Sequence, residues 1–199
     1  MSAPKQKIYP ITPAIDYRKI ADAQEFYTEY GFEEIAVPWI INFPAYSATR
    51  PPDRPEFYTL GGYLNASGEQ SFIELMLNGV KLKKNMCVTA CFRDELVIDE
   101  LRHKYFVKLE LIDTAANTAG LVRMVELCRS FFERYIATYV VETGESDGEK
   151  TYDIVDSKNK IELGSYGIRH FRHLSWVYGT GVALPRLSWV LKKGDRNVQ

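Results

Sequence analysis

The sequence has few cysteines, almost no net charge and no long apolar run. Its three cysteines are an odd number and do not indicate a disulfide framework. With a net charge of −1, only a local patch such as Lys81, Lys83 and Lys84 could attract nucleic acid. No apolar stretch reaches the length of a membrane span, and the N-terminus lacks the apolar core of a signal peptide. We therefore expect a cytoplasmic protein without membrane contact.

Cys87, Cys91 and His103 are the residues that would suggest a zinc site. Both cysteines lie in the apolar run 86–92, which favours a buried strand, and cysteine is common in protein cores. We therefore do not expect zinc. The sequence also contains no internal repeat and no low-complexity tract.

The bulk composition is that of a soluble globular domain. The 199 residues are 46% hydrophobic and 26% charged, which is enough to build one sizeable core. Residues 1–13 are polar and carry three prolines, so they look like a lead-in. Residues 42–56 carry four prolines and predict a loop, of which 44–56 is a candidate lid or partner surface.

Three segments have the spacing of amphipathic helices. Residues 16–30 run from a candidate N-cap at Asp16 to a stop at Gly31. Residues 67–77 open with Ser67 and Gln70 at the spacing of a capping box, with a buried face of Phe72, Leu75 and Met76. Residues 117–137 give the longest helical pattern. An alternating strand is predicted at 32–38, where it ends at a proline, and an interrupted one at 57–64.

Polar side chains gather in the segment 91–110, which predicts two strands joined by a polar loop. Arg93 and Glu95 are predicted to share one face of the first strand, and Phe106, Lys108 and Glu110 one face of the second. A guanidinium suits phosphate, and an aromatic face can stack on a purine. By itself, an ordinary hairpin with a cross-strand ion pair explains the same pattern.

Two later segments carry further polar residues. Residues 152–155 and 160–164 predict a hairpin on which Asp153 and Glu162 face each other. Two carboxylates suit magnesium, although a solvated face is the simpler interpretation. Residues 176–187 place two glycines at a predicted turn, with Arg186 at the start of an apolar helix. Residues 143–150 read as a charged turn.

Taken in order, these stretches resemble the catalytic domain of class II aminoacyl-tRNA synthetases, and most closely the aspartyl, asparaginyl and lysyl branch. Residues 20–38 resemble motif 1, a helix followed by a strand that ends in proline. Phe92-Arg93-Asp94-Glu95 is similar to the FRxE form of motif 2, with its second strand at 106–110. Residues 179–186 are similar to motif 3 of seryl enzymes, and residues 152–170 to a stretch of bacterial aspartyl enzymes.

The resemblance implies an α+β fold in which an antiparallel β-sheet is flanked by helices. It covers residues 15–191, between a lead-in at 1–14 and a tail at 192–199, with no anticodon-binding domain expected. It also implies a homodimer formed through motif 1.

The resemblance implies an ATP site with Mg²⁺. Arg93 would hold the α-phosphate and Arg186 the γ-phosphate, and both would be catalytic. Phe106 would stack on the adenine, while Glu95 and His103 would contact ATP from the strand and the loop.

Magnesium would be held by Asp153 and Glu162, and the amino acid would be bound by Gln70, Glu162 and Arg169. Arg169 corresponds to the arginine that reads the side-chain carboxylate in aspartyl enzymes, which makes an acidic or amide amino acid the expected substrate. A departure is Ile73, which stands where those enzymes have a lysine.

The implied function is an ATP-dependent ligase that forms an aminoacyl-adenylate and passes the amino acid to tRNA or to another acceptor. Two alternatives stay open from the sequence. One is an ammonia-dependent asparagine synthetase of the same fold, and the other is a non-catalytic regulatory or binding module.

Overall fold

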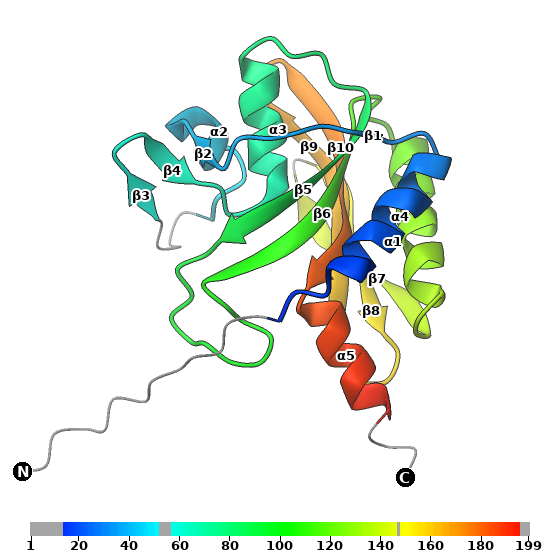
Figure 1. The fold of residues 1–199 in the computed structure, drawn as a ribbon. Helices are drawn as coiled ribbons and strands as arrows, with labels where there is room; N and C mark the ends of the chain where they lie inside the picture. Colours follow the sequence, from blue (N-terminus) through cyan, green and yellow to red (C-terminus); the bar gives the residue numbers. More distant parts are fainter. Residues whose placement is uncertain (1–13, 52–56, 147, 196–199) are drawn as a thin grey trace, which may run out of the picture.

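The computed structural model describes residues 14–51, 57–146 and 148–195 of the chain. Its centre is a seven-stranded sheet in the order β1-β5-β6-β10-β9-β8-β7 (Figure 1). All neighbours pair antiparallel except β1 and β5, which pair parallel. The strands are β1 (Glu33–Glu34), β5 (Lys84–Phe92), β6 (Tyr105–Asp113), β7 (Thr138–Ser146), β8 (Glu149–Asp156), β9 (Glu162–Phe171) and β10 (Leu174–Leu184).

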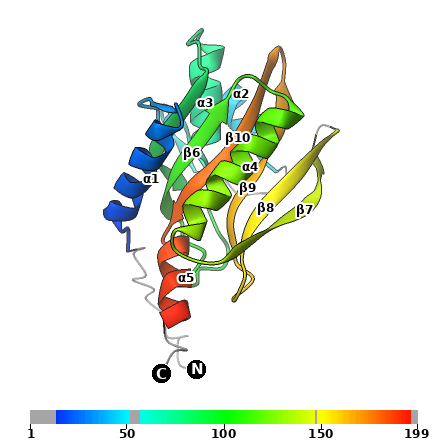
Figure 2. The same cartoon turned by 90° about the vertical axis from the view of Figure 1, so that its right-hand side faces the viewer.

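Helices lie on both faces of this sheet, as Figure 2 shows. On one face, α1 (Tyr17–Glu29) and α4 (Thr118–Glu133) pack against β6, β9 and β10. On the other face, α3 (Gly68–Leu77) packs against β5 and β6. The expected α+β architecture, an antiparallel sheet flanked by helices, is confirmed.

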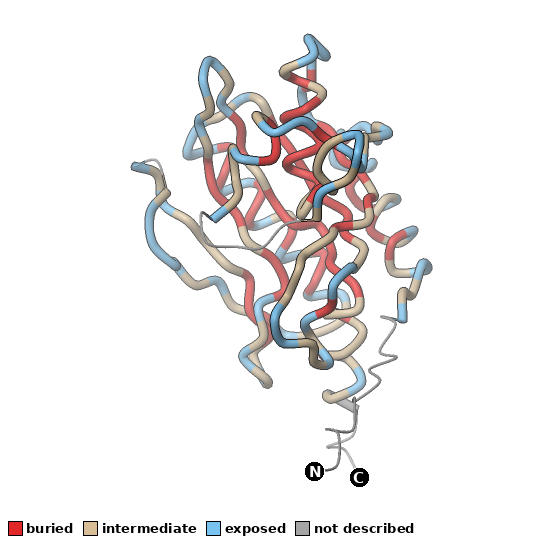
Figure 3. Tube along the Cα trace, turned by 90° about the vertical axis from the view of Figure 1, so that its left-hand side faces the viewer, coloured by how far each residue is buried: buried red, intermediate tan, exposed pale blue. Residues whose placement is uncertain are grey.

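Smaller elements complete the molecule. A three-stranded sheet in the order β2-β4-β3 lies beside α2 and α3. Its strands are β2 (Ile40–Ile41), β3 (Tyr58–Thr59) and β4 (Gly62–Leu64), and α2 spans Phe43–Ser47. The last helix, α5 (Arg186–Asp195), follows β10 and extends into the predicted tail. Buried positions concentrate in the strands and on the inner sides of the helices (Figure 3).

The predicted helix at 16–30 is confirmed as α1. The Asp16 carboxylate accepts a hydrogen bond from the Arg18 backbone N–H at 3.2 Å, as an N-cap should. Ile20, Ala23 and Tyr27 lie in the core as their spacing predicts. Tyr30 does not: its side chain is 54% exposed.

The predicted helix at 67–77 is also confirmed, but its first turn is held differently. Ser67 occupies the N-cap position without a side-chain hydrogen bond, and Gln70 accepts from the Ala66 backbone N–H at 2.8 Å. The carboxylate of Glu110, on β6, accepts from the Glu69 backbone N–H at 2.6 Å. A Cβ on Gly68 would lie 2.9 Å from that Glu110 oxygen, so the close approach requires glycine. A distant strand therefore caps α3.

Three predictions of local structure are wrong. The strand expected at 32–38 shrinks to Glu33–Glu34, and the turn expected at 143–150 belongs to the β7–β8 hairpin. Gly179 and Gly181 lie inside β10 rather than at a turn. Strands β1 and β10 pair with segments far away in the sequence, which local patterns do not reveal, whereas β7 and β8 form a local hairpin whose strands reach further toward the turn than predicted.

The candidate lid at 44–56 is only partly a loop. Its beginning forms α2, and residues 52–56 lie outside the described part of the chain. Cys87 and Cys91 are buried in strand β5, as expected, and both are free thiols. Among the described residues, no group of three or more histidine, cysteine, aspartate or glutamate side chains could hold a metal.

Candidate functional site

Two adjoining cavities open on the face of the sheet that carries α3. The larger, here called the α3 cavity, has a volume of about 310 Å³ and lies between α2, α3, β9 and β10. The smaller, here called the loop cavity, measures about 100 Å³ and lies between the β5–β6 loop and the start of α5. Residues that line both are Arg93, Glu95, Lys108, Glu162 and Thr180. The two cavities therefore form one site with two parts.

The residues predicted from the sequence divide between these parts. His103, Phe106 and Arg186, which were predicted for ATP, line the loop cavity alone. Gln70 and Arg169, which were predicted for the amino acid, line the α3 cavity alone. Arg93, Glu95 and Glu162 line both, and Asp153 lines neither.

Arg93 lies where the two cavities meet and is held from two sides. Its Nε donates to the Ala66 carbonyl at 3.1 Å, and its guanidinium lies 5.0 Å from the centre of the Phe106 ring. Strand β5 ends at Phe92, so the prediction that Arg93 and Glu95 share a strand face is wrong. The predicted shared face of Phe106, Lys108 and Glu110 agrees with the contacts these side chains make on β6.

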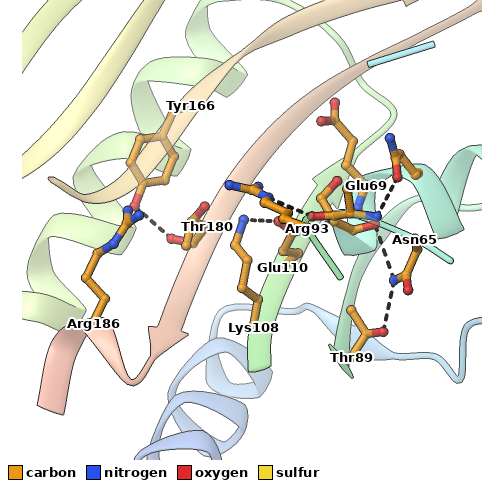
Figure 4. Close-up of polar contacts among 12 residues, drawn as sticks. Asn65, Glu69, Thr89, Arg93, Lys108, Glu110, Tyr166, Thr180 and Arg186 are labelled. Atoms are coloured by element: carbon orange, nitrogen blue, oxygen red, sulfur yellow. Dashed lines mark hydrogen bonds and ion pairs between the residues drawn. The ribbon is translucent and has the colours of Figure 1, made fainter. Parts of the chain in front are cut away.

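A buried ion pair joins Lys108 and Glu110 beneath the site (Figure 4). Both side chains are almost fully buried, so the two charges compensate each other in a region that water does not screen. The second oxygen of Glu110 binds the Glu69 backbone N–H at the start of α3. A carboxylate at a helix N-terminus is further stabilised by the helix dipole.

Glu69 is a second buried carboxylate, on the wall of the α3 cavity. Its Oε1 accepts from the Trp176 indole N–H at 2.8 Å and lies 3.3 Å from Arg169 Nε. Burial raises the pKa of Glu69 above its usual value, although Arg169 and Trp176 act in the opposite direction. The Arg169 guanidinium also lies 4.7 Å from the centre of the Tyr178 ring. The charge of Arg169 is thus balanced within the protein.

Gln70 is bonded at both ends of its amide. Its oxygen accepts from the Ala66 N–H, and its nitrogen donates to the Tyr46 carbonyl at 2.9 Å. Its side chain therefore joins α2 to the start of α3 at the cavity wall.

In the loop cavity, the lining residues Arg186 and His103 have fewer or more exposed partners within the protein. Arg186 Nη1 donates to Glu162 Oε1 at 2.8 Å and to the Glu162 carbonyl at 3.2 Å. His103 is buried, with Nε2 3.3 Å from the Glu100 carbonyl and no protein partner for Nδ1.

The two predicted magnesium ligands do not face each other as expected. A register shift pairs Asp153 with Ser165 and Glu162 with Val155. The Glu162 carboxylate nevertheless acts on Asp153: burial raises the pKa of Asp153, and the charge of Glu162 raises it further.

The buried or half-buried polar groups of the site that the sequence did not single out are Glu69, Trp176 and Tyr178, whereas Lys108 and Glu110 were predicted only to share a strand face. Two charged residues at alternate positions of an apolar strand, Lys108 and Glu110, are a usable signal for a buried pair. The bond from Trp176 to Glu69 joins residues 107 positions apart and has no local signal.

The sequence matches no protein-family model and no curated protein. The structure does match solved structures. A pyrrolysyl-tRNA synthetase of Desulfitobacterium hafniense superposes with a TM-score of 0.70 at 18% identity, over 91% of this chain and 70% of that chain. The seryl-tRNA synthetase of Pyrococcus horikoshii, solved with ATP, gives 0.69 at 15% identity, over 86% of this chain and 48% of that chain. The chain has the class II aminoacyl-tRNA synthetase fold.

A third match agrees with this fold. The cytoplasmic serine-tRNA ligase of Naegleria fowleri, solved with AMP, gives a TM-score of 0.66 at 17% identity, over 85% of this chain and 46% of that chain. These similar structures are pyrrolysyl and seryl enzymes, so they support the class II fold without supporting the aspartyl, asparaginyl and lysyl branch. Within the described residues, no helix is both long and apolar enough to cross a membrane.

Proposed function

We propose that the chain is an ATP-dependent ligase that activates an amino acid as its adenylate. The observation that carries the proposal is the two-part cavity with Arg93 at the junction. His103, Phe106 and Arg186, expected for the nucleotide, line one part, and Gln70 and Arg169, expected for the amino acid, line the other. A carboxylate bound in the α3 cavity would meet an α-phosphate beside Arg93.

In the proposed reaction, an oxygen of the amino-acid carboxylate attacks the α-phosphorus. The bond from that phosphorus to the bridging oxygen of the β-phosphate breaks, and pyrophosphate leaves. The carboxylate is already ionised, so no general base is needed, and catalysis consists of positioning and charge neutralisation. Arg93 suits this role because Ala66 and Phe106 hold its guanidinium before any ligand arrives.

The loop cavity suits the rest of the nucleotide. Phe106 offers a ring face for the adenine, while Glu95 and His103 offer polar contacts from the lining. Arg186 would bind the γ-phosphate, which requires it to exchange its ion pair with Glu162 for one with phosphate.

Magnesium would compensate the phosphate charge. Glu162 fits a role as its protein ligand, because it lines both cavities and magnesium binds through one or two carboxylates and substrate phosphates. Asp153 lines neither cavity, and its pKa is raised first by burial and then by the neighbouring Glu162 carboxylate.

The lining of the α3 cavity favours an amide over an acidic side chain. Arg169 can donate to a side-chain oxygen, but Glu69 lies 3.3 Å from the same guanidinium. A second carboxylate there would be repelled by Glu69, whereas an amide can accept from Arg169 and donate to Glu69. This argues against the synthesis of asparagine from aspartate as the main activity.

We also propose a cytoplasmic homodimer that passes the amino acid to tRNA or to another acceptor. Exposed aromatic side chains on α1 and at its end support a contact there, since Tyr17 is 67% and Tyr30 54% exposed. Gel filtration with light scattering tests this contact, and a stable monomer at micromolar concentration would contradict it.

Amino-acid-dependent exchange of pyrophosphate into ATP tests the activity. We expect exchange with asparagine or glutamine above that with aspartate or glutamate. Exchange with none of the twenty common amino acids would contradict the proposal. Calorimetric titration with ATP then separates a non-catalytic module that binds ATP from one that does not, and amide formation stimulated by ammonia would identify an asparagine synthetase.

A further inference from the structure

Strand β10 lines both cavities, and an irregularity lies where they meet. Tyr178 and Gly179 line the α3 cavity alone, Thr180 lines both cavities, and residues 183–186, at and just after the end of β10, line the loop cavity alone. The pairing of β10 with β6 shifts between Thr180 and Val182, so Gly181 is the extra residue of a β-bulge.

The bulge changes which side of the sheet each later residue faces. Before it, Val177 lies in the core beneath α1 and α4, and Thr180 lines the cavities. After it, Val182 lies in that same core, and Ala183 lines the loop cavity. Side chains alternate along an unbroken strand, so odd and even positions exchange faces at Gly181. Without the bulge, Ala183 would face the helices.

Two tyrosine hydroxyls bind the carbonyls at this bulge. Tyr166 donates to the Thr180 carbonyl at 2.8 Å (Figure 4), and Tyr27 donates to the Gly181 carbonyl at 3.0 Å. Strand β9 pairs with β10 only as far as Gly179, so the hydroxyls replace strand partners beyond that point. Burial raises the pKa of both tyrosines well above the usual value, which keeps them protonated as donors.

A glycine lies against each of the two tyrosine side chains, where a larger residue would collide with it. A Cβ on Gly164 would lie 2.4 Å from the Tyr166 hydroxyl, and a Cβ on Gly181 would lie 2.8 Å from the Tyr27 ring. Tyr27 comes from α1, on the opposite side of the sheet from the cavities. One hydrogen bond therefore connects that outer helix to the strand that carries the site.

We propose that Tyr27 and Tyr166 are positioning residues, whose hydroxyls hold the β10 bulge and so fix Arg186 relative to Thr180. Arg186 follows β10 after the single residue Pro185, so a displacement of the bulge passes directly to its guanidinium. The expected effect on the reaction rate rests on the proposed function, whereas the expected effect on the stability of the bulge does not.

The test removes each hydroxyl and keeps the ring, in the variants Tyr27→Phe and Tyr166→Phe and in the double variant. We expect kcat for pyrophosphate exchange to fall about 10-fold in each and up to about 100-fold in the double variant, with KM for the amino acid unchanged. Tyr135→Phe is the matched control, because it removes a hydroxyl bond of 2.6 Å to Asp22 on α1 that does not touch β10. It should leave kcat unchanged.

Amide hydrogen exchange of residues 177–186 gives a readout that needs no activity. We expect about 10-fold faster exchange in the double variant and no change in Tyr135→Phe. Wild-type kcat and protection in both single variants would overturn the proposal, as would equal losses in Tyr135→Phe. If the wild-type protein activates no amino acid, the proposed function fails, and hydrogen exchange still decides whether the hydroxyls hold the bulge.

Discussion

The α3 cavity and the loop cavity share residues but are built in different ways. In the α3 cavity, the side chains of Glu69, Gln70 and Arg169 are bonded to the protein itself and hardly need a ligand to hold them. In the loop cavity, Arg186 has one half-exposed carboxylate as partner, and His103 has a nitrogen without one. A preorganised wall suits the selection of a substrate, and groups with exchangeable partners suit the binding and release of phosphates.

The largest effect should come from the ion pair beneath the α3 cavity. Lys108→Ala leaves Glu110 buried without its cation, and we expect a loss of about 3–5 kcal/mol in the free energy of unfolding. Urea denaturation measures it. Lys104→Ala is the control, because its ion pair with Asp94 is exposed and should be worth less than about 1 kcal/mol. Equal losses in both variants would contradict the expected difference between a buried and an exposed ion pair.

The next largest effect is expected at Arg93, where the two cavities meet. Arg93→Ala should lower kcat for pyrophosphate exchange by about 10²–10³-fold, as the loss of one preorganised donor does. Arg129→Ala, which removes an exposed cation of α4 paired with Glu133, should leave the rate unchanged. If the rate of Arg93→Ala stayed within twofold of wild type, Arg93 would not take part in the proposed reaction.

A smaller effect is expected at the wall of the α3 cavity, where Glu69 and Arg169 would contact the side chain of the amino acid. Glu69→Gln removes the carboxylate beside Arg169, so an acidic side chain would meet an uncompensated guanidinium. We expect kcat/KM for aspartate or glutamate to rise about 10-fold relative to the amide, by analogy with other charge exchanges in binding sites. Glu74→Gln on the same helix, where the carboxylate binds Asn42, should leave the ratio unchanged. An unchanged ratio in Glu69→Gln would assign specificity elsewhere.

The smallest effect comes from Asp153. Its pKa in the folded state is raised, first by burial and then by Glu162, so the ionised group destabilises the fold at neutral pH. Asp153→Asn should therefore raise the free energy of unfolding, by less than about 1 kcal/mol because the group is partly exposed. The gain should disappear as the pH falls through the folded-state pKa of Asp153, where the wild-type carboxyl becomes protonated. Unfolding measured across pH 3–7 checks the sign.

A feature of the fold or of the site could be predicted from the sequence when the residues that interact lie close together in the chain. Helix α1 was predicted because its cap and apolar spacing are local, and the order of Arg93, Glu162, Arg169 and Arg186 suggested the site. The cap on α3 was not predictable, since Glu110 lies 41 residues from the N–H it binds. The bulge at Gly181 was misread as a turn, because a glycine in a strand and a glycine in a turn look alike until pairing is known.

The cap that Glu110 supplies to α3 also bears on the order in which the molecule folds. A helix that is capped by its own serine can form its first turn without a contact to a distant part of the chain. Here Ser67 makes no such bond, and the Glu69 N–H finds its acceptor in Glu110 on β6, which is paired with β5 in the folded protein. We therefore expect the start of α3, on the wall of the α3 cavity, to become stable only after β6 has formed, because its capping contact joins residues far apart in the sequence.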